Sequence, residues 1–383
     1  MCLNSDNCGV IEMAQSLILK KLSDLGQSVW YDNISRELIQ SGGLGAIVAN
    51  GVTGLTSNPS IFEKAISTSS VYDSDIESLA RNDLRNDEIF EALAISDIQN
   101  AADLLSDIYH ATGRTDGFVS LEVNPHLATD TNGTIKEARK LFQAVDRPNL
   151  MIKVPATPAG IPAIKALISE GINVNVTLIF SRVVYGTVRE AYISGLEELS
   201  NRGGDLSNVS SVASFFVSRV DTVIDGCLEE SDQHLIGKSA IANAKVAYED
   251  FRHTFSLGRY QTLQNSGAKV QRPLWASTSV KNPDFSDVMY VDSLIGPDTV
   301  NTMPDVTLDA YKDHGNPSLT ITSDFDDSLA HLGMIEEAGI NMDEITEKLL
   351  VDGLKAFSDS YDQLIENISE KRTSLLVEQQ SSD

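Results

Sequence analysis

The sequence predicts a (β/α)8 barrel, a closed parallel β-sheet surrounded by helices, with additional helices at the N-terminus, in insertions and at the C-terminus. Three observations support this fold class. Short apolar segments alternate with helical patterns, which is typical of a parallel sheet. These segments number eight, the strand count of the barrel. The 383 residues exceed the about 250 of a typical barrel, which leaves room for insertions. A doubly wound open sheet is the structural alternative.

The strands are expected where an apolar run is bounded by glycine, asparagine or proline. They lie at 28–33, 51–57, 117–124, 150–156, 172–180, 209–216, 272–277 and 298–304. Helical patterns follow them, for example at 135–145, 160–170 and 184–201. The surplus residues fit an N-terminal helix at about 10–26, paired helices within 60–112, an insertion within 225–268 and C-terminal helices. With no repeat and no clear linker, residues 1–383 are expected to form a single domain.

The charge is strongly negative and unevenly distributed. There are 55 acidic and 29 basic residues, which gives a formal net charge of −26. Residues 305–383 hold 18 acids and 5 bases, so we expect a solvated, acidic helical region there. Nucleic acids and anionic membranes require clustered Lys and Arg, so neither is an expected partner. A small anionic substrate, which needs only a few local bases, stays compatible with this composition.

The cysteines predict a reducing compartment. Cys2, Cys8 and Cys227 form neither a metal-binding spacing nor an even disulfide set, so no metal site is expected. The N-terminal segment lacks the basic and apolar regions of a secretory signal. No apolar stretch reaches the ~18 residues of a membrane span. A cytoplasmic location is therefore predicted.

Two predicted strands alternate in a way that is unusual for a barrel. In 172–178 and 118–124 every second residue is apolar, and the other face carries polar residues such as Asn175, Thr177 and Glu122. Helices cover the outside of a βα barrel, so the apolar set is expected to point outward. The polar set then points into the barrel, where it must be satisfied by partners or used in function.

Lys153 lies within an apolar strand, between Ile152 and Val154. Lysine is almost never fully buried without a partner. Desolvation of an amine favours its neutral, nucleophilic form, and such lysines form Schiff bases with carbonyl substrates. The alternative is a lysine at an exposed strand end or one paired with Glu122.

Two carboxylates lie near the C-terminal ends of predicted strands, where the active sites of βα barrels are built. These are Asp32 and Glu122. Imine chemistry moves protons to and from hydroxyl groups and water, so acids and bases beside the lysine would serve it. Each carboxylate alone could equally cap a helix.

Six segments in order resemble transaldolase. Leu55-Thr-Ser-Asn-Pro-Ser-Ile61, Met151-Ile-Lys-Val-Pro-Ala156, Asn173-Val-Asn-Val-Thr-Leu-Ile-Phe180 and Ala213-Ser-Phe-Phe-Val-Ser-Arg219 are similar to signature segments of that family. Trp275-Ala-Ser-Thr-Ser-Val-Lys-Asn282 and residues 290–304 resemble its longer bacterial branch. The resemblance runs from about residue 15 to about residue 360. It implies a Schiff-base transferase that needs no cofactor, because the iminium itself accepts the electrons.

The resemblance also implies roles for single residues. Lys153 is the Schiff-base lysine, and Glu122 is the acid and base that works through a water held by Thr177. Asp32 takes the proton during carbon–carbon cleavage. The reaction exchanges sedoheptulose 7-phosphate and glyceraldehyde 3-phosphate for erythrose 4-phosphate and fructose 6-phosphate, in the pentose phosphate pathway, by moving a dihydroxyacetone unit.

The same resemblance implies the binding residues. Asn58 and Asn175 match the amides that bind the hydroxyls of the transferred unit, and Ser214 is similar to a small inward residue beside it. Arg219 and Lys281 match the phosphate site. Short family members have arginine where we align Lys281, and a lysine holds phosphate as a point charge and not bidentately.

Two other functions stay open from the sequence. A fructose-6-phosphate aldolase resembles the same family and releases free dihydroxyacetone, but its members carry glutamine at the position of Glu122. A barrel that binds sugar phosphates without turnover is the non-catalytic alternative. Whether the chain forms a homodimer is also left open.

Overall fold

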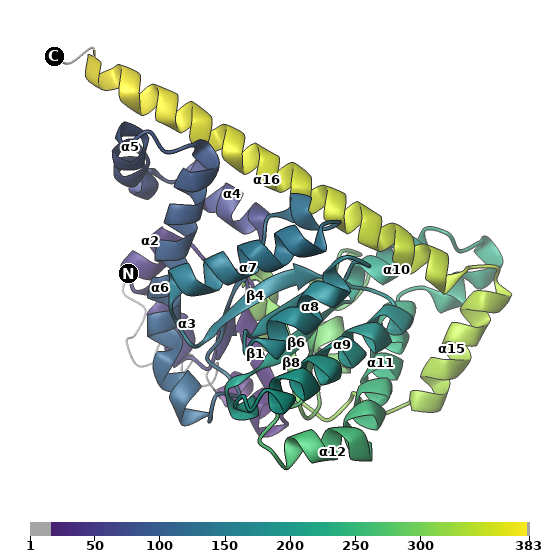
Figure 1. The fold of residues 1–383 in the computed structure, drawn as a ribbon. Helices are drawn as coiled ribbons and strands as arrows, with labels where there is room; N and C mark the ends of the chain where they lie inside the picture. The colour runs from purple at the N-terminus through teal and green to yellow at the C-terminus, as the bar shows by residue number, and fades with distance from the viewer. Residues whose placement is uncertain (1–16, 381–383) are drawn as a thin grey trace.

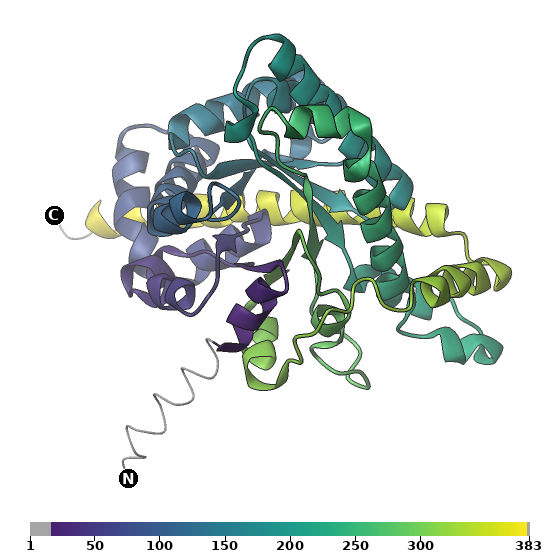
Figure 2. The same cartoon turned by 90° about the horizontal axis from the view of Figure 1, so that it is seen from below.

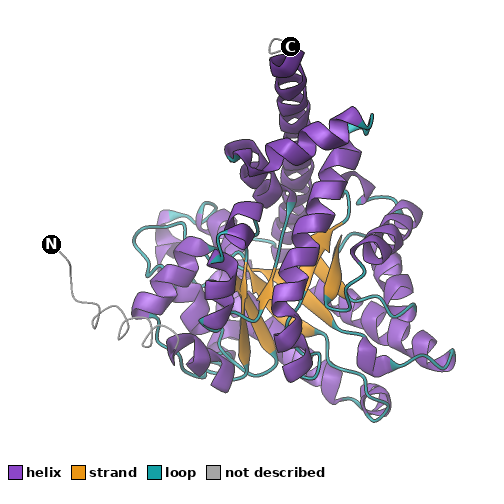
Figure 3. Ribbon diagram, turned by 90° about the vertical axis from the view of Figure 1, so that its left-hand side faces the viewer, coloured by secondary structure: helices purple, strands orange, loops and turns teal. Residues whose placement is uncertain are grey.

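The fold is a closed parallel barrel, as predicted. A computed structural model describes residues 17–380. Within this range eight strands pair in chain order, and β8 pairs with β1 to close the barrel, so the open-sheet alternative is excluded. The strands, orange in Figure 3, lie inside a layer of helices. They are β1 (Gln27–Tyr31), β2 (Gly54–Leu55), β3 (Val119–Glu122), β4 (Leu150–Pro155), β5 (Val174–Ile179), β6 (Ser211–Phe216), β7 (Arg272–Ala276) and β8 (Thr299–Met303).

All eight predicted strands are present: β1 begins one residue before its predicted start, and the other seven lie within their predicted bounds. Helices occupy the predicted intervals and surround the strands in Figures 1 and 2. They are α2 (Arg36–Gln40), α3 (Gly43–Ala49), α4 (Pro59–Thr68), α5 (Asp73–Arg81), α6 (Asn86–Ala111), α7 (Thr131–Val145), α8 (Gly160–Ser169), α9 (Arg182–Asn201), α10 (Ser218–Asp225), α11 (Ser239–Ser256), α12 (Gly258–Gln264), α13 (Met289–Ser293), α14 (Asp305–His314), α15 (Phe325–Glu337) and α16 (Met342–Gln380). Of the helix predicted at about 10–26, residues 17–24 are helical, and 10–16 lie outside the described residues. No helix within 17–380 is long and apolar enough to cross a membrane.

A helix cap and a glycine fix the positions of two outer helices, α7 and α9. Asp130 caps the N-terminus of α7 by accepting a hydrogen bond from the backbone N–H of Gly133 (3.0 Å). On α9, a Cβ at Gly195 would lie 2.8 Å from the side chain of Ile168 on α8. A larger residue at Gly195 would therefore push α9 away from α8.

The polar faces of β3 and β5 point into the barrel, as predicted. Asn175 on β5 donates from Nδ2 to Ser120 Oγ on β3 (3.0 Å) and accepts at Oδ1 from Ser214 Oγ on β6 (2.7 Å). These bonds cross the barrel interior and satisfy groups that would otherwise be costly to bury. They form a hydrogen-bonded layer beneath the mouth of the barrel.

The alternation predicted for 172–178 ends at Thr177. The pairing of β5 with β6 shifts between Val176 and Ile179, and Leu178 has a φ of +58°. A branched residue rarely adopts this left-handed conformation, so the bulge re-aims the end of β5. Leu178 consequently faces α16, where its side chain lies 3.0 Å from the position that a Cβ would take at Gly353.

The expectation of a merely solvated C-terminal region is wrong for one face of α16. This helix of 39 residues, yellow in Figures 1 and 2, packs on α4, α5, α6 and α10 and passes across one end of the barrel. Leu364 and Ile368 are fully buried on it, and Phe357 is 6 % exposed. Its outer face carries the acidic residues, some of them in pairs such as Lys348–Asp352. The prediction is correct for helicity and charge, but hydrophobic burial holds this helix against the domain.

Candidate active site

Lys153 lies at the centre of the mouth that α16 covers. Strand β4 places its side chain inside the barrel, where it is 6 % exposed. Its Nζ donates to the carbonyl of Ser57 (3.1 Å) and lies 3.7 Å from Glu122 Oε2. The ring of Phe357 is 5.7 Å from Nζ. Lys153 is therefore buried beside a carboxylate, and the exposed strand end considered from the sequence is excluded.

Glu122 is the neighbour of Lys153 across the sheet, since the β3–β4 register pairs these two residues. Its side chain is also 6 % exposed. Burial raises the pKa of Glu122 to about 7, and the nearby Lys153 ammonium opposes that rise. Its Oε2 has no hydrogen-bond partner among the described residues. A carboxyl group that titrates near neutrality can serve as an acid and as a base under physiological conditions.

Asp32 follows β1 on the opposite side of the mouth. Its backbone N–H donates to the carbonyl of Met303 (2.9 Å), and its Oδ1 accepts a hydrogen bond from Thr56 Oγ1 (2.6 Å). Burial raises the pKa of Asp32, while the positive charges of Lys153 and Arg219 oppose the rise. The carboxyl group is thus held by the ends of two strands and faces the same space as the lysine.

One cavity of about 180 Å³ collects most of the predicted site residues, and we call it the lysine cavity. Its lining includes Asp32, Asn58, Lys153, Thr177, Ser214, Arg219 and Lys281. These residues come from loops and strand ends all around the barrel. The fold therefore brings seven of the nine predicted site residues to one cavity.

Two of the predicted residues stand outside this lining. Asn175 lies beneath it, in the hydrogen-bonded layer with Ser120 and Ser214. Glu122 forms an ion pair with Lys153 but lines a second cavity instead. The Oγ1 of Thr177 is buried and, like Glu122 Oε2, has no hydrogen-bond partner among the described residues.

The cationic wall of the lysine cavity is formed by Arg219 and Lys281. Arg219 is the second residue of α10, which follows β6, and its guanidinium lies 5.3 Å from the centre of the Phe216 ring. Burial lowers the pKa of Arg219, and the carboxylate of Asp32 opposes this effect. Lys281 stands on the exposed loop after β7. Two cations at one end of the cavity can hold an anionic group in an otherwise acidic protein.

Sequence reasoning missed several residues of this lining. Ser279 lies two positions before Lys281, and its hydroxyl is 2.7 Å from that of Thr307. Ser277 lines the cavity with a φ of +56°, a strained backbone at the end of β7. Both residues lie in segment 275–282, which resembles the family, and this resemblance could have identified them. Phe357 had no such signal, because it reaches the cavity from a helix more than 200 residues after Lys153.

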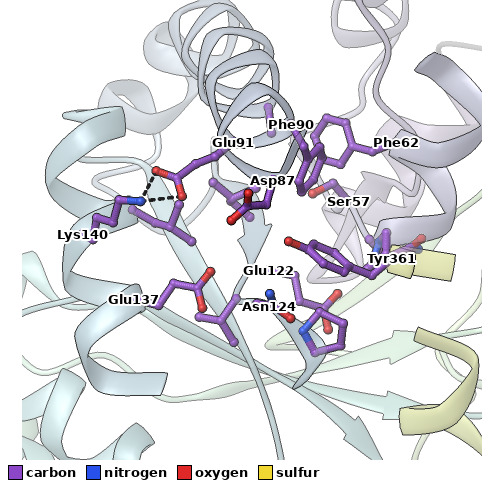
Figure 4. A pocket seen from close by; sticks show the side chains of 17 residues that line it. Ser57, Phe62, Asp87, Phe90, Glu91, Glu122, Asn124, Glu137, Lys140 and Tyr361 are labelled. Atoms are coloured by element: carbon purple, nitrogen blue, oxygen red, sulfur yellow. Dashed lines mark hydrogen bonds and ion pairs between the residues drawn. The ribbon is translucent and has the colours of Figure 1, made fainter. Parts of the chain in front are cut away.

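The second cavity, which we call the side cavity, has a volume of about 210 Å³. It lies between α6, α7 and α16, and Figure 4 shows the side chains around it. Its lining includes Ser57, Asn58, Phe62, Asp87, Phe90, Glu91, Ala94, Glu122, Asn124, Glu137, Lys140, Leu141 and Tyr361. Four carboxylates face one lysine there, so the two cavities have opposite charge character.

Comparisons with known proteins agree with this geometry. The family model for transaldolase/fructose-6-phosphate aldolase matches residues 29–368. The chain belongs to this family. The chain is 47 % identical over 363 residues to the transaldolase of Thermobifida fusca, a match that covers 92 % of this chain and 98 % of that one. It is 45 % identical over 369 residues to transaldolase 2 of a Nostoc species, with 92 % and 97 % covered. The family and the names of these relatives indicate a transferase of the transaldolase type, and the family implies sugar-phosphate substrates.

Proposed function

We propose that this transaldolase-type enzyme moves a dihydroxyacetone unit from sedoheptulose 7-phosphate to glyceraldehyde 3-phosphate through a Schiff base on Lys153. The products are erythrose 4-phosphate and fructose 6-phosphate. The observation that carries this proposal is the buried pair of Lys153 Nζ and Glu122 Oε2, 3.7 Å apart inside the barrel. An amine and a carboxyl group that titrates near neutrality are what imine formation requires.

Imine formation uses Lys153 as the nucleophile and Glu122 as the acid. The neutral amine attacks C2 of the ketose, and a proton moves from nitrogen to oxygen to give the carbinolamine. Glu122 then donates a proton to that oxygen, which leaves as water while nitrogen forms the iminium. A water between Glu122 and Thr177 is the proposed carrier of these protons, because the carboxyl Oε2 and the hydroxyl Oγ1 are both buried with no hydrogen-bond partner among the described residues.

Carbon–carbon cleavage uses Asp32 as the base. Its carboxylate takes the proton of the C4 hydroxyl, the C3–C4 bond breaks, and its electron pair passes to the iminium. An aldehyde leaves, and an enamine of three carbons stays on Lys153. The acceptor aldehyde then bonds to the enamine carbon, Asp32 returns the proton to the new alkoxide, and water hydrolyses the new imine.

The remaining residues hold the substrate. Asn58 accepts the N–H of Ile61 through Oδ1 (3.0 Å), which leaves its Nδ2 available for a hydroxyl of the transferred unit. Asn175 keeps one donor hydrogen after its bond to Ser120, and Ser214 fixes its orientation. Arg219 and Lys281 are the proposed phosphate ligands, since both line the cavity that holds Lys153.

Transfer differs from simple cleavage because the enamine must persist until an acceptor aldehyde binds. Phe357 lies over Lys153 and is itself 6 % exposed, so α16 closes the mouth above the reacting amine. A water-poor site slows loss of the intermediate until an acceptor arrives. Glu122 in place of glutamine likewise favours transfer over the aldolase reaction.

Reductive trapping tests this function. Borohydride treatment with fructose 6-phosphate, followed by peptide mapping, should place the adduct on Lys153, and Lys153→Ala should lose both the adduct and transfer. An adduct elsewhere, or full activity of Lys153→Ala, would refute the assignment. Rapid release of dihydroxyacetone without an acceptor, at a rate comparable to transfer, would support the aldolase instead.

A cytoplasmic location is part of the proposal. Cys227 is exposed and forms no disulfide within residues 17–380, as expected of a thiol in a reducing compartment, while Cys2 and Cys8 lie outside the described residues. Fractionation of the native cell would test this location, and light scattering would decide between a monomer and a homodimer.

A further inference from the structure

Lys153 and Glu122 separate two cavities. Lys153 lines the lysine cavity but not the side cavity, and Glu122 lines the side cavity but not the lysine cavity. The register pairs these two residues on adjacent strands, so the contact between amine and carboxyl group lies where the two linings meet. Asn58 is the residue that lines both cavities.

The side cavity joins a buried floor to an exposed rim. Glu122 and Ala94 are buried at its inner end, while the side chains of Asp87 and Lys140 at its rim are 43 % and 59 % exposed. Figure 4 shows Glu122 beside Tyr361 and Asn124, with the charged side chains grouped beyond them. Its volume of about 210 Å³ accommodates several water molecules at roughly 30 Å³ each.

The charges that line each cavity determine which molecules can enter it. The lysine cavity presents Lys153, Arg219 and Lys281, which attract a sugar phosphate. The side cavity presents four carboxylates, and Glu91 already neutralises its one lysine, Lys140, through an ion pair of 2.5 Å. A phosphate dianion is repelled by this lining, whereas neutral water is hydrogen-bonded by it.

We propose that the side cavity is the water passage of the active site. The water released by imine formation leaves through the side cavity, and the water that hydrolyses the imine enters through it. The sugar phosphate meanwhile fills the lysine cavity. This inference rests on the proposed Schiff-base function. In the step concerned, Lys153 nitrogen bonds to C2, and the C2 oxygen takes one proton from that nitrogen and a second from Glu122. The C2–O bond then breaks, which releases one molecule of water and leaves the iminium. Hydrolysis reverses these changes with a water drawn from the same passage.

Oxygen exchange tests the passage. Fructose 6-phosphate labelled with ¹⁸O at C2 loses its label whenever the departing water escapes before the imine is hydrolysed. We would measure label loss by mass spectrometry, subtract the loss without enzyme, and divide by the rate of adduct formation under borohydride. This ratio reports escape of water for each imine formed and is independent of overall activity.

Variants that narrow the side cavity are used to obstruct the proposed water passage. Ala94 is buried on α6 and lines the side cavity, so Ala94→Leu adds bulk to the passage away from Lys153. We expect the label lost per imine to fall several-fold. Ala101→Leu is the matched control, because Ala101 is fully buried two turns along the same helix and lines neither cavity. Ala94→Val, and Leu141→Phe from α7, narrow the same space if Ala94→Leu does not fold.

The outcomes separate the hypotheses. An unchanged ratio in folded narrowing variants would mean that water leaves through the lysine cavity, and the inference would be overturned. An equal fall in Ala101→Leu would assign the effect to packing of α6 and would also overturn it. A wild-type enzyme with neither label loss nor a borohydride adduct would instead refute the Schiff-base function itself.

Discussion

The pH dependence of imine formation should identify Glu122 as the acid. Burial raises the pKa of this carboxyl group to about 7, so its protonated, proton-donating form dominates below that pH and is lost above it. From that value, about 90 % of Glu122 is protonated at pH 6 and about 10 % at pH 8. Its contribution to imine formation should therefore fall about tenfold between these two pH values.

The assay compares wild type with Glu122→Gln. Rapid mixing with fructose 6-phosphate and borohydride quenching gives the rate of adduct formation at pH 6, 7 and 8. At pH 6 the variant should be slower by about 10²- to 10⁴-fold, the usual contribution of a positioned acid or base. The ratio of wild-type to variant rates should then fall about tenfold by pH 8. Taking this ratio cancels the titration of every other group that both proteins share.

A second buried carboxyl group serves as the control. Burial raises the pKa of Asp221 to about 6, but this residue bonds to the N–H of Ala240 and the hydroxyl of Tyr290 and lines neither cavity. Asp221→Asn should keep the wild-type pH profile. A constant ratio between wild type and Glu122→Gln, or loss of the profile in Asp221→Asn, would refute the assignment of Glu122.

Two further predictions concern the site, and a third concerns the attachment of α16. Lys281→Ala should raise the KM for sugar phosphates about tenfold at low salt with little change in kcat, because it removes about 1.4 kcal/mol of phosphate binding, and a kcat effect alone would contradict this role. Phe357→Ala should increase release of dihydroxyacetone relative to transfer, since it opens the mouth above Lys153, and an unchanged product ratio would count against the enclosure. Leu364→Ala should lower the free energy of unfolding in urea by about 2–5 kcal/mol, because Leu364 is fully buried between α16 and the domain, and a loss below about 1 kcal/mol would mean that α16 is loosely attached.

The features that sequence reasoning predicted are those encoded by local periodicity. The alternation around Asn175 gave both the strand and the inward direction of its polar face. Lys153 was recognisable because a single charge within an apolar strand is a local anomaly. Likewise Asp32 and Glu122 stood at strand ends, which topology alone brings to one edge of the barrel.

The features that were missed depend on contacts between distant segments. An acidic helical segment reads as solvated when its partners are unknown, although Leu364 and Phe357 are buried on it. The bulge at Leu178 has no sequence signal, since a leucine with positive φ is held in place by its surroundings. The side cavity is likewise a space between α6, α7 and α16, and no single segment encodes it.

The position of α16 in the chain determines which segment covers Lys153. All eight strands and every proposed chemical group precede residue 304. Phe357, which lines the lysine cavity, and Tyr361, which lines the side cavity, nevertheless come from α16. The barrel therefore carries its own chemistry, but the cover over its reactive amine comes from a helix that follows the barrel in the chain, where Phe357 lies 5.7 Å from Lys153 Nζ.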